Sequence, residues 1–425
     1  MEVKFIINLS IGILLFAACE SGNNASCDLE SIKIDVDKVC LSRDEVYASK
    51  IMIDQIGEIL NIQPYYDDES SIDESSILDT TFFEMVKLET NENCILSDNI
   101  NQVSIHGDTI IIADYNTKSI YFFNKEGEYL TKISHMGRGP QDYIDISDVF
   151  FDDKYLFITD NYGSKILCFD FVAQFKYKVG IEGSYGENAI CYHDTVFALT
   201  STRRSHNNII SVFDRNGNQI GQHIPYFPNR DHKMMSGGVK HAFISQPDGF
   251  DVFVPDYTAA DNYQHSNVVY HYANGKFSPK YWIDFGKHNV PLKIARKGFD
   301  YFYNTKCNEK YVSGVNSIHD SGRFLLFHIN FCHVTYGVIY DKKTSNTMSN
   351  GWYSCYFKKF NISTGVNDDF LVYNDNLFVY VPANIAKYEE IIGCDTLKWQ
   401  NLKQTLKDDD NGILVMLKLK SYDTD

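Results

Sequence analysis

Three basic side chains gather within one short segment of this acidic chain. The segment STRRSH (201–206) contains Arg203, Arg204 and His206. The planar guanidinium fork of arginine matches carboxylate, phosphate and uronate groups, so these residues are candidates for binding an anionic ligand. The alternative is that both arginines form structural ion pairs with neighbouring parts of the fold.

A second candidate segment, PDYTAADNYQHSN (255–267), combines aromatic, amide, acidic and imidazole side chains. Aromatic rings offer flat apolar surface for stacking on sugars, and a few polar groups beside them fix the orientation of a ligand. We therefore regard Tyr257 and His265, with the neighbouring Asp256 and Asp261, as candidates for glycan binding. The alternative is a solvated insertion that binds nothing.

A third segment, SHMGRGPQDY (134–143), reads as an ordered loop between two strands. Gly137 and Gly139 allow backbone angles that are closed to other residues, and Pro140 fixes its own φ and restricts the residue before it. The pattern predicts a fixed structural crossover. That crossover presents three more ligand-binding candidates, Arg138, Asp142 and Tyr143. The alternative for Arg138 is that its guanidinium ties the loop to backbone carbonyls.

No motif of an established catalytic or metal site occurs in the chain. There is no G-x-S-x-G elbow, phosphate-binding P-loop, H-E-x-x-H helix or EF-hand loop. His328 and His333 straddle INFC, but no spacing marks a set of metal ligands. We therefore assign no catalytic residue and expect no cofactor, with a divalent metal in a central channel as the less favoured alternative.

The elements that must position these residues are strands. The 29 Tyr and 29 Phe residues favour pleated sheets, and the net charge of −17 argues against nucleic acid as a partner. Segments 100–133 and 145–181 share one pattern of four short strands and tight polar turns. Looser copies of this pattern follow, at 187–224, 241–285, 315–348 and from 368 onward. The period of the repeat is about 45 residues. This period, with four strands per unit and six units, predicts an all-β fold, a six-bladed β-propeller.

Closing such a ring usually requires one chain end to complete the blade of the other. The strands FFEMVKLET (82–90) and ILVMLKLK (413–420) lie at opposite ends of the repeat region. We predict that they meet in one composite blade.

The N-terminus reads as an export signal. Residues 1–18 contain an apolar run too short to span a bilayer, which suits a signal peptide. The tail LFAAC resembles the bacterial lipobox, so we expect lipidation of Cys19; the alternative is an ordinary signal peptide with an incidental cysteine. Residues 19–80 are expected to be a tether and acidic linker with a short helix, and residues 81–425 the propeller. Nine cysteines follow Cys19; most are expected to be buried, with room for one or two disulfides.

The crossover MGRGPQDYIDISDVFFD resembles the G-R-G-P-G-E-Y crossover of the six-bladed β-propeller lipoproteins of Bacteroidetes, which are relatives of NHL-type propellers. The segments FFEMVKLETNEN and NGILVMLKLK resemble the first and closing strands of that family. Gln141 and Asp142 stand where the family pattern has Gly and Glu. The resemblance implies the fold and an outer-membrane lipoprotein facing the periplasm or the cell surface. It implies no chemistry.

Three functions remain open. We favour a lipid-anchored, non-enzymatic propeller that binds a glycan, another anionic ligand or a partner envelope protein at one face. The alternatives are a metal-assisted lyase or lactonase, or a glycan-active enzyme, with its site in the central channel, and a structural subunit of an outer-membrane uptake complex.

Overall fold

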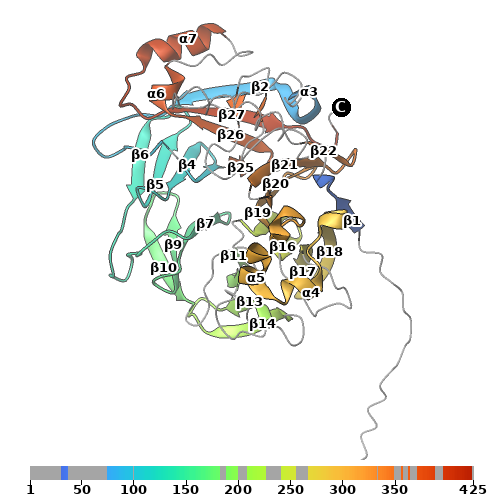
Figure 1. Cartoon of the computed structure of the whole chain (residues 1–425). Helices are drawn as coiled ribbons and strands as arrows, with labels where there is room; N and C mark the ends of the chain where they lie inside the picture. The colour runs from blue at the N-terminus through green and yellow to red at the C-terminus, as the bar shows by residue number, and fades with distance from the viewer. Residues whose placement is uncertain are drawn as a thin grey trace, which may run out of the picture.

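The computed structural model describes residues 30–36, 74–98, 100–181, 188–199, 208–225, 241–254, 267–332, 334–348, 356–357, 362–363, 371–387 and 396–423. Six small sheets form a ring around a common axis (Figure 1). Within each sheet, consecutive strands pair with each other in antiparallel fashion. The predicted six-bladed β-propeller is therefore confirmed.

The first three blades follow one another directly along the chain. Blade 1 contains β3 (Gln102–His106), β4 (Thr109–Asp114), β5 (Ser119–Asn124) and β6 (Tyr129–Ile133). Blade 2 contains β7 (Asp148–Phe151), β8 (Tyr155–Asp160), β9 (Lys165–Asp170) and β10 (Phe175–Gly180). Blade 3 contains β11 (Ala189–Tyr192), β12 (Thr195–Leu199), β13 (Asn208–Phe213) and β14 (Gln219–Pro225).

The remaining blades carry insertions. Blade 4 contains β15 (Phe243–Gln246), β16 (Gly249–Val254), β17 (Val268–Ala273) and β18 (Lys276–Asp284). The short helices η2 (Gly286–His288), α4 (Leu292–Ala295), α5 (Gly298–Asn304) and η3 (Cys307–Glu309) lead on to blade 5, which contains β19 (Gly314–Asp320), β20 (Phe324–Phe331), β21 (Val334–Asp341) and β22 (Asn346–Met348). Blade 6 contains β25 (Leu371–Tyr373), β26 (Asn376–Val381), β27 (Ile413–Leu419) and β2 (Leu78–Lys87). Outside these blades lie α3 (Glu74–Ile77), α6 (Ala383–Ala386), α7 (Thr396–Thr405) and a two-stranded sheet of β23 (Tyr356–Phe357) and β24 (Ile362–Ser363).

The same side-chain hydrogen bonds stabilise the hairpin between the third and fourth strands in each of blades 1 to 3. The third strand ends at or just before Asn124, Asp170 or Asp214, and the Oδ1 atom of each accepts hydrogen bonds from the backbone N–H groups two and four residues further on. Asn and Asp favour turns because they can bond their own backbone in this way. The repeat visible in the sequence is therefore a repeat of turn chemistry as well as of apolar strands.

The apolar faces of the blades are buried between neighbours. Between blades 1 and 2, Ile111 and Phe122 pack in one cluster with Leu156 and Leu167, all at most 1% exposed. A single four-stranded sheet cannot bury both of its faces, so stacking around the axis supplies the core. The stacking also places the first strand of each blade nearest the axis, where β7 contacts β11 and β25 contacts β3.

The ring closes through blade 6, as predicted. β2 pairs antiparallel with β27, with Met85 opposite Val415 and Phe83 opposite Leu417. Strand β2, which precedes the repeat units of blades 1 to 5, thereby becomes the outer strand of a blade whose other strands follow them. Trp399 of α7 is 1% exposed and packs in the same cluster as Met85 and Val415, covering this blade.

A strand upstream of the repeat also joins the ring. β1 (Glu30–Lys33) pairs in parallel with β18 and makes blade 4 five-stranded. Its residues alternate: Ile32 and Ile34 are buried against blades 4 and 5, whereas Lys33 is exposed. We expected residues 19–80 to be a tether and linker, and this part of them is instead strand. The segment RDEVYASKIMIDQIGEIL (43–60), where the short helix is expected, lies outside the described residues.

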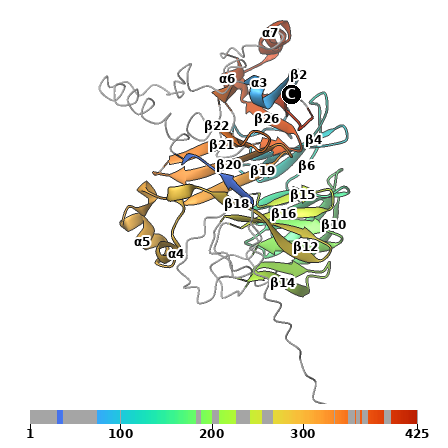
Figure 2. The same ribbon diagram turned by 90° about the vertical axis from the view of Figure 1, so that its right-hand side faces the viewer.

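The connections between strands fall on two faces of the disc, because strands alternate in direction within each blade. Hairpins between first and second strands, and between third and fourth, lie on what we call the hairpin face. Connections between second and third strands, and the crossovers between blades, lie on the opposite crossover face. The hairpins are short, whereas the long connections that carry α4 to α7 all leave from the crossover face; Figure 2 shows α4 and α5 projecting from it.

Five cysteines fall within the described residues, and all carry free thiols: Cys94, Cys168, Cys191, Cys307 and Cys332. Cys94, Cys168 and Cys307 are buried, as expected for small apolar side chains. Burial raises the pKa of Cys94, Cys168 and Cys191 to about 12. These three thiols therefore stay protonated and unreactive.

Candidate functional site

The crossover loop from blade 1 to blade 2 is folded around the carboxylate of Asp142. The backbone N–H of Gly139 donates a hydrogen bond to Asp142 Oδ2 at 2.7 Å. A Cβ atom would lie 2.5 Å from that oxygen at Gly137 and 2.6 Å from it at Gly139. Neither glycine has a positive φ, so both are needed for the close approach of Asp142 and not for unusual backbone angles. Asp142 thus shapes the loop from within.

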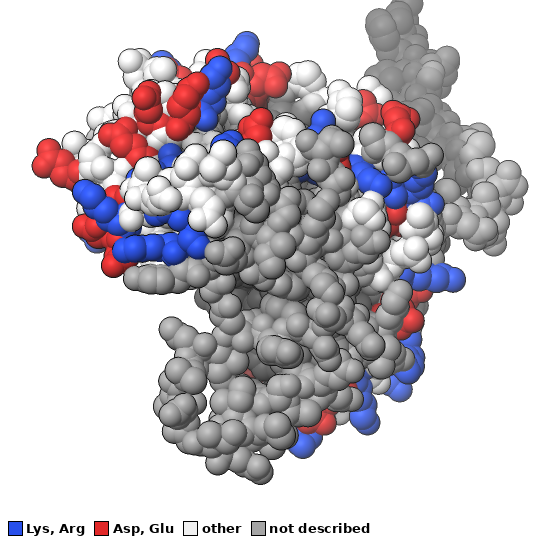
Figure 3. Space-filling view, turned by 90° about the horizontal axis from the view of Figure 1, so that it is seen from above, with Lys and Arg blue, Asp and Glu red and all other residues white. Residues whose placement is uncertain are grey.

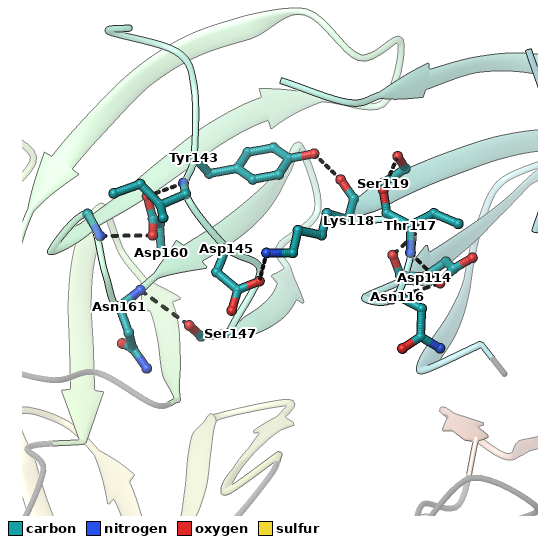
Figure 4. Close-up of polar contacts among 12 residues, drawn as sticks. Asp114, Asn116, Thr117, Lys118, Ser119, Tyr143, Asp145, Ser147, Asp160 and Asn161 are labelled. Carbon is teal, nitrogen blue, oxygen red and sulfur yellow. Dashed lines mark hydrogen bonds and ion pairs between the residues drawn. The ribbon is translucent and has the colours of Figure 1, made fainter. Parts of the chain in front are cut away.

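Tyr143 points away from solvent into the core between blades 1 and 2. It is fully buried, and its hydroxyl donates to the carbonyl of Lys118 at 2.6 Å (Figure 4). The backbone N–H of His135 donates to the same hydroxyl at 3.3 Å. Burial raises the pKa of Tyr143. The side chain therefore joins two blades and is covered on all sides by protein.

Two buried aspartates each accept hydrogen bonds from two segments of the chain. One is the segment that enters the blade, and the other is the turn between the second and third strands of that blade. Asp160 accepts the N–H of Ile144 at 3.0 Å and that of Gly163 at 2.9 Å. Asp114 does the same in blade 1, where it accepts the N–H of Ser97 at 2.7 Å and that of Thr117 at 3.1 Å. Both carboxylates are fully buried, so the acidic groups at this rim are occupied by the fold itself.

Arg138 is the predicted crossover residue that remains open to solvent. Its side chain is exposed, and it makes no hydrogen bond or ion pair with any residue that the structure describes. The tie to backbone carbonyls that we considered for Arg138 is therefore not present among these residues. Its guanidinium keeps its full capacity for an anionic partner.

The other predicted positions lie outside the described residues: Cys19, Arg203, Arg204, His206, Tyr257 and His265, together with Asp256 and Asp261. Two of the segments concerned have described ends. Residues 200–207 connect β12 to β13, and residues 255–266 connect β16 to β17. Both are second-to-third-strand connections, so their ends lie on the crossover face with Arg138.

A polar cluster on the axis was missed by the sequence analysis. His241, just before β15 of blade 4, has its Nδ1 atom 3.5 Å from Oδ1 of Asp148, the first residue of β7 in blade 2. The ring centroid of His241 lies 5.3 Å from that of His319 in β19 of blade 5. Three blades thus contribute one carboxylate and two imidazoles to one point on the axis. We call Asp148, His241 and His319 the axial cluster.

The axial cluster belongs to a wider polar lining. Blades 1 to 3 carry a polar residue at one equivalent position near the start of the first strand. This position lies four residues before the residue that begins the hairpin between the first and second strands. The residues are Gln102, Asp148 and Asn188. Asn188 is buried and its Oδ1 atom accepts the N–H of Ala242 at 2.5 Å, which ties blade 3 to blade 4. The recurrence of a polar residue at this position in three successive blades is the signal that could have revealed this lining.

The chemistry available on the axis is that of hydrogen bonding and proton exchange. An imidazole beside a carboxylate can donate to, accept from and carry a proton for a bound polar group. Among the described residues, no group of three or more His, Cys, Asp and Glu side chains is arranged to hold a metal ion.

The sequence from residue 57 to residue 418 matches the family described as "Domain of unknown function (DUF4934)". The chain belongs to the DUF4934 family. No curated protein matches it. The matched residues begin before β2 and end within β27, so they include every repeat unit.

Solved structures share the fold at low identity. A "Putative exported protein" of Bacteroides fragilis NCTC 9343 superposes with a TM-score of 0.61 at 18% identity, over 82% of this chain and 98% of its own. A member of the DUF4221 family from Bacteroides vulgatus gives 0.44 at 11% identity, over 80% and 97%. Apo AztD from Citrobacter koseri gives 0.41 at 9%, over 79% and 98%. The first supports the propeller fold, and the other two scores are too low to support any conclusion.

Proposed function

We propose that this chain is an exported, lipid-anchored propeller that binds a polar ligand, a glycan or anionic compound, at the crossover face above the axial cluster. The lipobox-like segment ending at Cys19 supports the anchor. The similarity to a Bacteroides protein described as exported agrees with export. No helix among the described residues is long and apolar enough to cross a membrane.

The observation that carries the proposal is the convergence of Asp148, His241 and His319 from three blades. Binding sites in ring-shaped folds benefit from groups held by separate rigid elements, because those groups need no reordering when a ligand arrives. Arg138 on the adjoining crossover adds an exposed cation on the same face. Segments 201–206 and 255–266, whose described neighbours lie on that face, contain further arginine, histidine and tyrosine residues.

The test is calorimetric titration with oligogalacturonate fragments, which carry both sugar hydroxyls and carboxylates. Arg138→Ala and His241→Asn are each expected to weaken binding at least about tenfold, or about 1.4 kcal/mol. Asn is chosen at 241 because His241 has φ 53° and Asn tolerates that conformation. Lys125→Ala, an exposed cation in a hairpin-face turn, is the matched control and should leave binding unchanged. Binding that survives both test substitutions would place the site elsewhere.

A second candidate function, an enzyme with its site on the axis, is favoured by the His241–Asp148 pair, which resembles an acid–base couple. Turnover of a glycan or lactone substrate that is abolished by Asp148→Asn, with binding retained, would select this function over simple binding.

A further inference from the structure

The insertion between blades 4 and 5 differs in charge from the rest of the molecule. We call residues 285–313, which contain η2, α4, α5 and η3, the basic insertion. It holds six cations, Lys287, Lys293, Arg296, Lys297, Lys306 and Lys310, against two acids, Asp300 and Glu309. Its net charge is thus four positive in a chain of net charge −17. All six cations are exposed.

The positive excess is local. Seen from above, over α6, α7 and blade 6, basic and acidic side chains are interspersed on the described surface (Figure 3). In the basic insertion, by contrast, exposed cations outnumber acids six to two, and Lys306 pairs with Glu309 at 3.4 Å. A strongly acidic protein therefore carries, in this insertion, a segment that attracts anions.

The basic insertion is held rigidly on the crossover face. Phe302 is fully buried, and the buried Asn308 accepts the N–H of Cys332 on its carbonyl at 2.9 Å. The Nδ1 atom of His288 lies 2.8 Å from the carbonyl of Lys310, and this contact joins the two ends of the insertion. The cations therefore project from a fixed scaffold, with Tyr301 half-buried beneath Lys297, whose Nζ lies 4.2 Å from the ring centroid.

Strand β1 brings the segment that follows Cys19 to the edge of the disc that carries the basic insertion. β1 runs parallel to β18, and the N–H of Ile34 donates to the carbonyl of Asp284, the last residue of β18 before the basic insertion. Figures 1 and 2 show β1 along the edge of β18, with α4 and α5 beyond the end of that strand. Cys19 precedes Glu30 by 11 residues. Such a segment spans at most about 40 Å when fully extended, so a lipid on Cys19 holds the membrane close to this edge.

We propose that the basic insertion docks on the anionic phospholipid headgroups of the membrane that carries the lipid anchor. The proposal rests on the anchor in the proposed function. Clustered lysines and arginines beside a membrane anchor are attracted to anionic lipid, and tyrosines suit the interface between water and lipid. Docking at this edge would fix the tilt of the disc and leave the opposite blades, 1 and 2, farthest from the bilayer.

The test uses the chain from Cys19 onward with Cys19→Ser, so that no lipid contributes. Co-sedimentation is measured with phosphatidylcholine vesicles, with and without one third phosphatidylglycerol. We expect binding only to the anionic vesicles, and loss of it in high salt, which screens charges. Lys293→Glu, Arg296→Glu and Lys297→Glu together should weaken binding at least about tenfold.

The matched control reverses three exposed lysines of the hairpin face: Lys125→Glu, Lys154→Glu and Lys276→Glu. It changes net charge by the same amount and should leave vesicle binding within about twofold of the parent. Equal losses in the two triple variants would mean that overall charge decides binding, and would overturn the proposal. So would an absence of binding to anionic vesicles by the parent chain, a result obtained without any charge variant. Since the parent here is unlipidated, either failure leaves the lipid anchor and the axial ligand site standing.

Discussion

The hydroxyl of Tyr373 in blade 6 lies 3.2 Å from Nε2 of His106 in blade 1, across the seam where the ring closes. His106 also stacks on Phe171, with ring centroids 4.3 Å apart, and tilts against Phe151 at 4.8 Å. Burial lowers the pKa of His106 to about 4, although the nearby Asp153 acts in the opposite direction. The neutral imidazole therefore joins blades 1, 2 and 6 on the hairpin face.

This seam predicts a pH dependence of stability. In the unfolded chain His106 takes up a proton below its ordinary pKa of 6.5, whereas in the folded chain it does so only near 4. The unfolded state thus binds more protons between these values, and stability falls as the pH falls through that window. Denaturant unfolding of wild type and His106→Gln should show a stability difference that shrinks between about pH 7 and about pH 4.5.

The control for the seam is His193→Asn, which removes an exposed histidine from a hairpin of blade 3. It should not change the pH profile. An NMR titration of His106 with a midpoint near its ordinary value would contradict the prediction.

Gly139→Ala should destabilise the crossover because its Cβ would meet Asp142 Oδ2 at 2.6 Å. We expect a loss of about 1–3 kcal/mol, typical of overpacking. Asp142→Ala removes the clash along with the hydrogen bond. The double variant should therefore be no less stable than Asp142→Ala alone, which is a measurable coupling. Gly180→Ala, where a Cβ would meet nothing within 4 Å, serves as the control; additive effects would rule out the proposed contact.

Met85→Ala should weaken ring closure. Met85 is 5% exposed and faces Val415 in the composite blade. Large-to-small changes at buried sites cost about 2–5 kcal/mol. The adjacent Glu84, which is exposed, offers a control in Glu84→Ala with an effect within about 0.5 kcal/mol. Urea unfolding measures both, and similar losses would argue against a closed ring.

Arg323→Met should destabilise the folded protein, because it removes the cation of a buried ion pair in blade 5. Arg323 Nε lies 3.1 Å and its Nη2 atom 2.9 Å from the two carboxylate oxygens of Asp341, with both side chains at most 8% exposed. Burial raises the pKa of Asp341, but hydrogen bonds from Arg323 and neighbouring groups outweigh it and keep that pKa low. Leaving the carboxylate unpaired should cost about 3–5 kcal/mol.

An exposed pair provides the comparison for Arg323. Lys387→Met breaks the contact with Asp408, whose side chain is 63% exposed, and should cost less than about 1 kcal/mol. Thermal melts above about pH 5, where Asp341 is ionised in both folded and unfolded chains, compare the two. Equal shifts in Tm for the two variants would contradict the larger contribution expected of the buried pair.

The fold was predictable because its signals are local and repeated. Turn residues such as Asp170 and Asp214 recur at a fixed point of each unit, and the strands between them are short and apolar. β1 was not predictable in the same way, because a lone alternating strand gives no sign of a parallel partner some 250 residues away. The axial cluster was missed for a related reason: Asp148, His241 and His319 are brought together only by closure of the ring. The glycines of the crossover were correctly singled out, but for their backbone angles and not for the carboxylate beside them.

The composite blade has a consequence for the order of events during biosynthesis. Phe83 finds its partner only when Leu417, more than 330 residues further along the chain, has been synthesised. Until then blade 6 lacks its two outer strands, and the pairing that completes it must close a very long loop, which slows folding. The ring therefore cannot close until β27 has been synthesised, however early the other blades form.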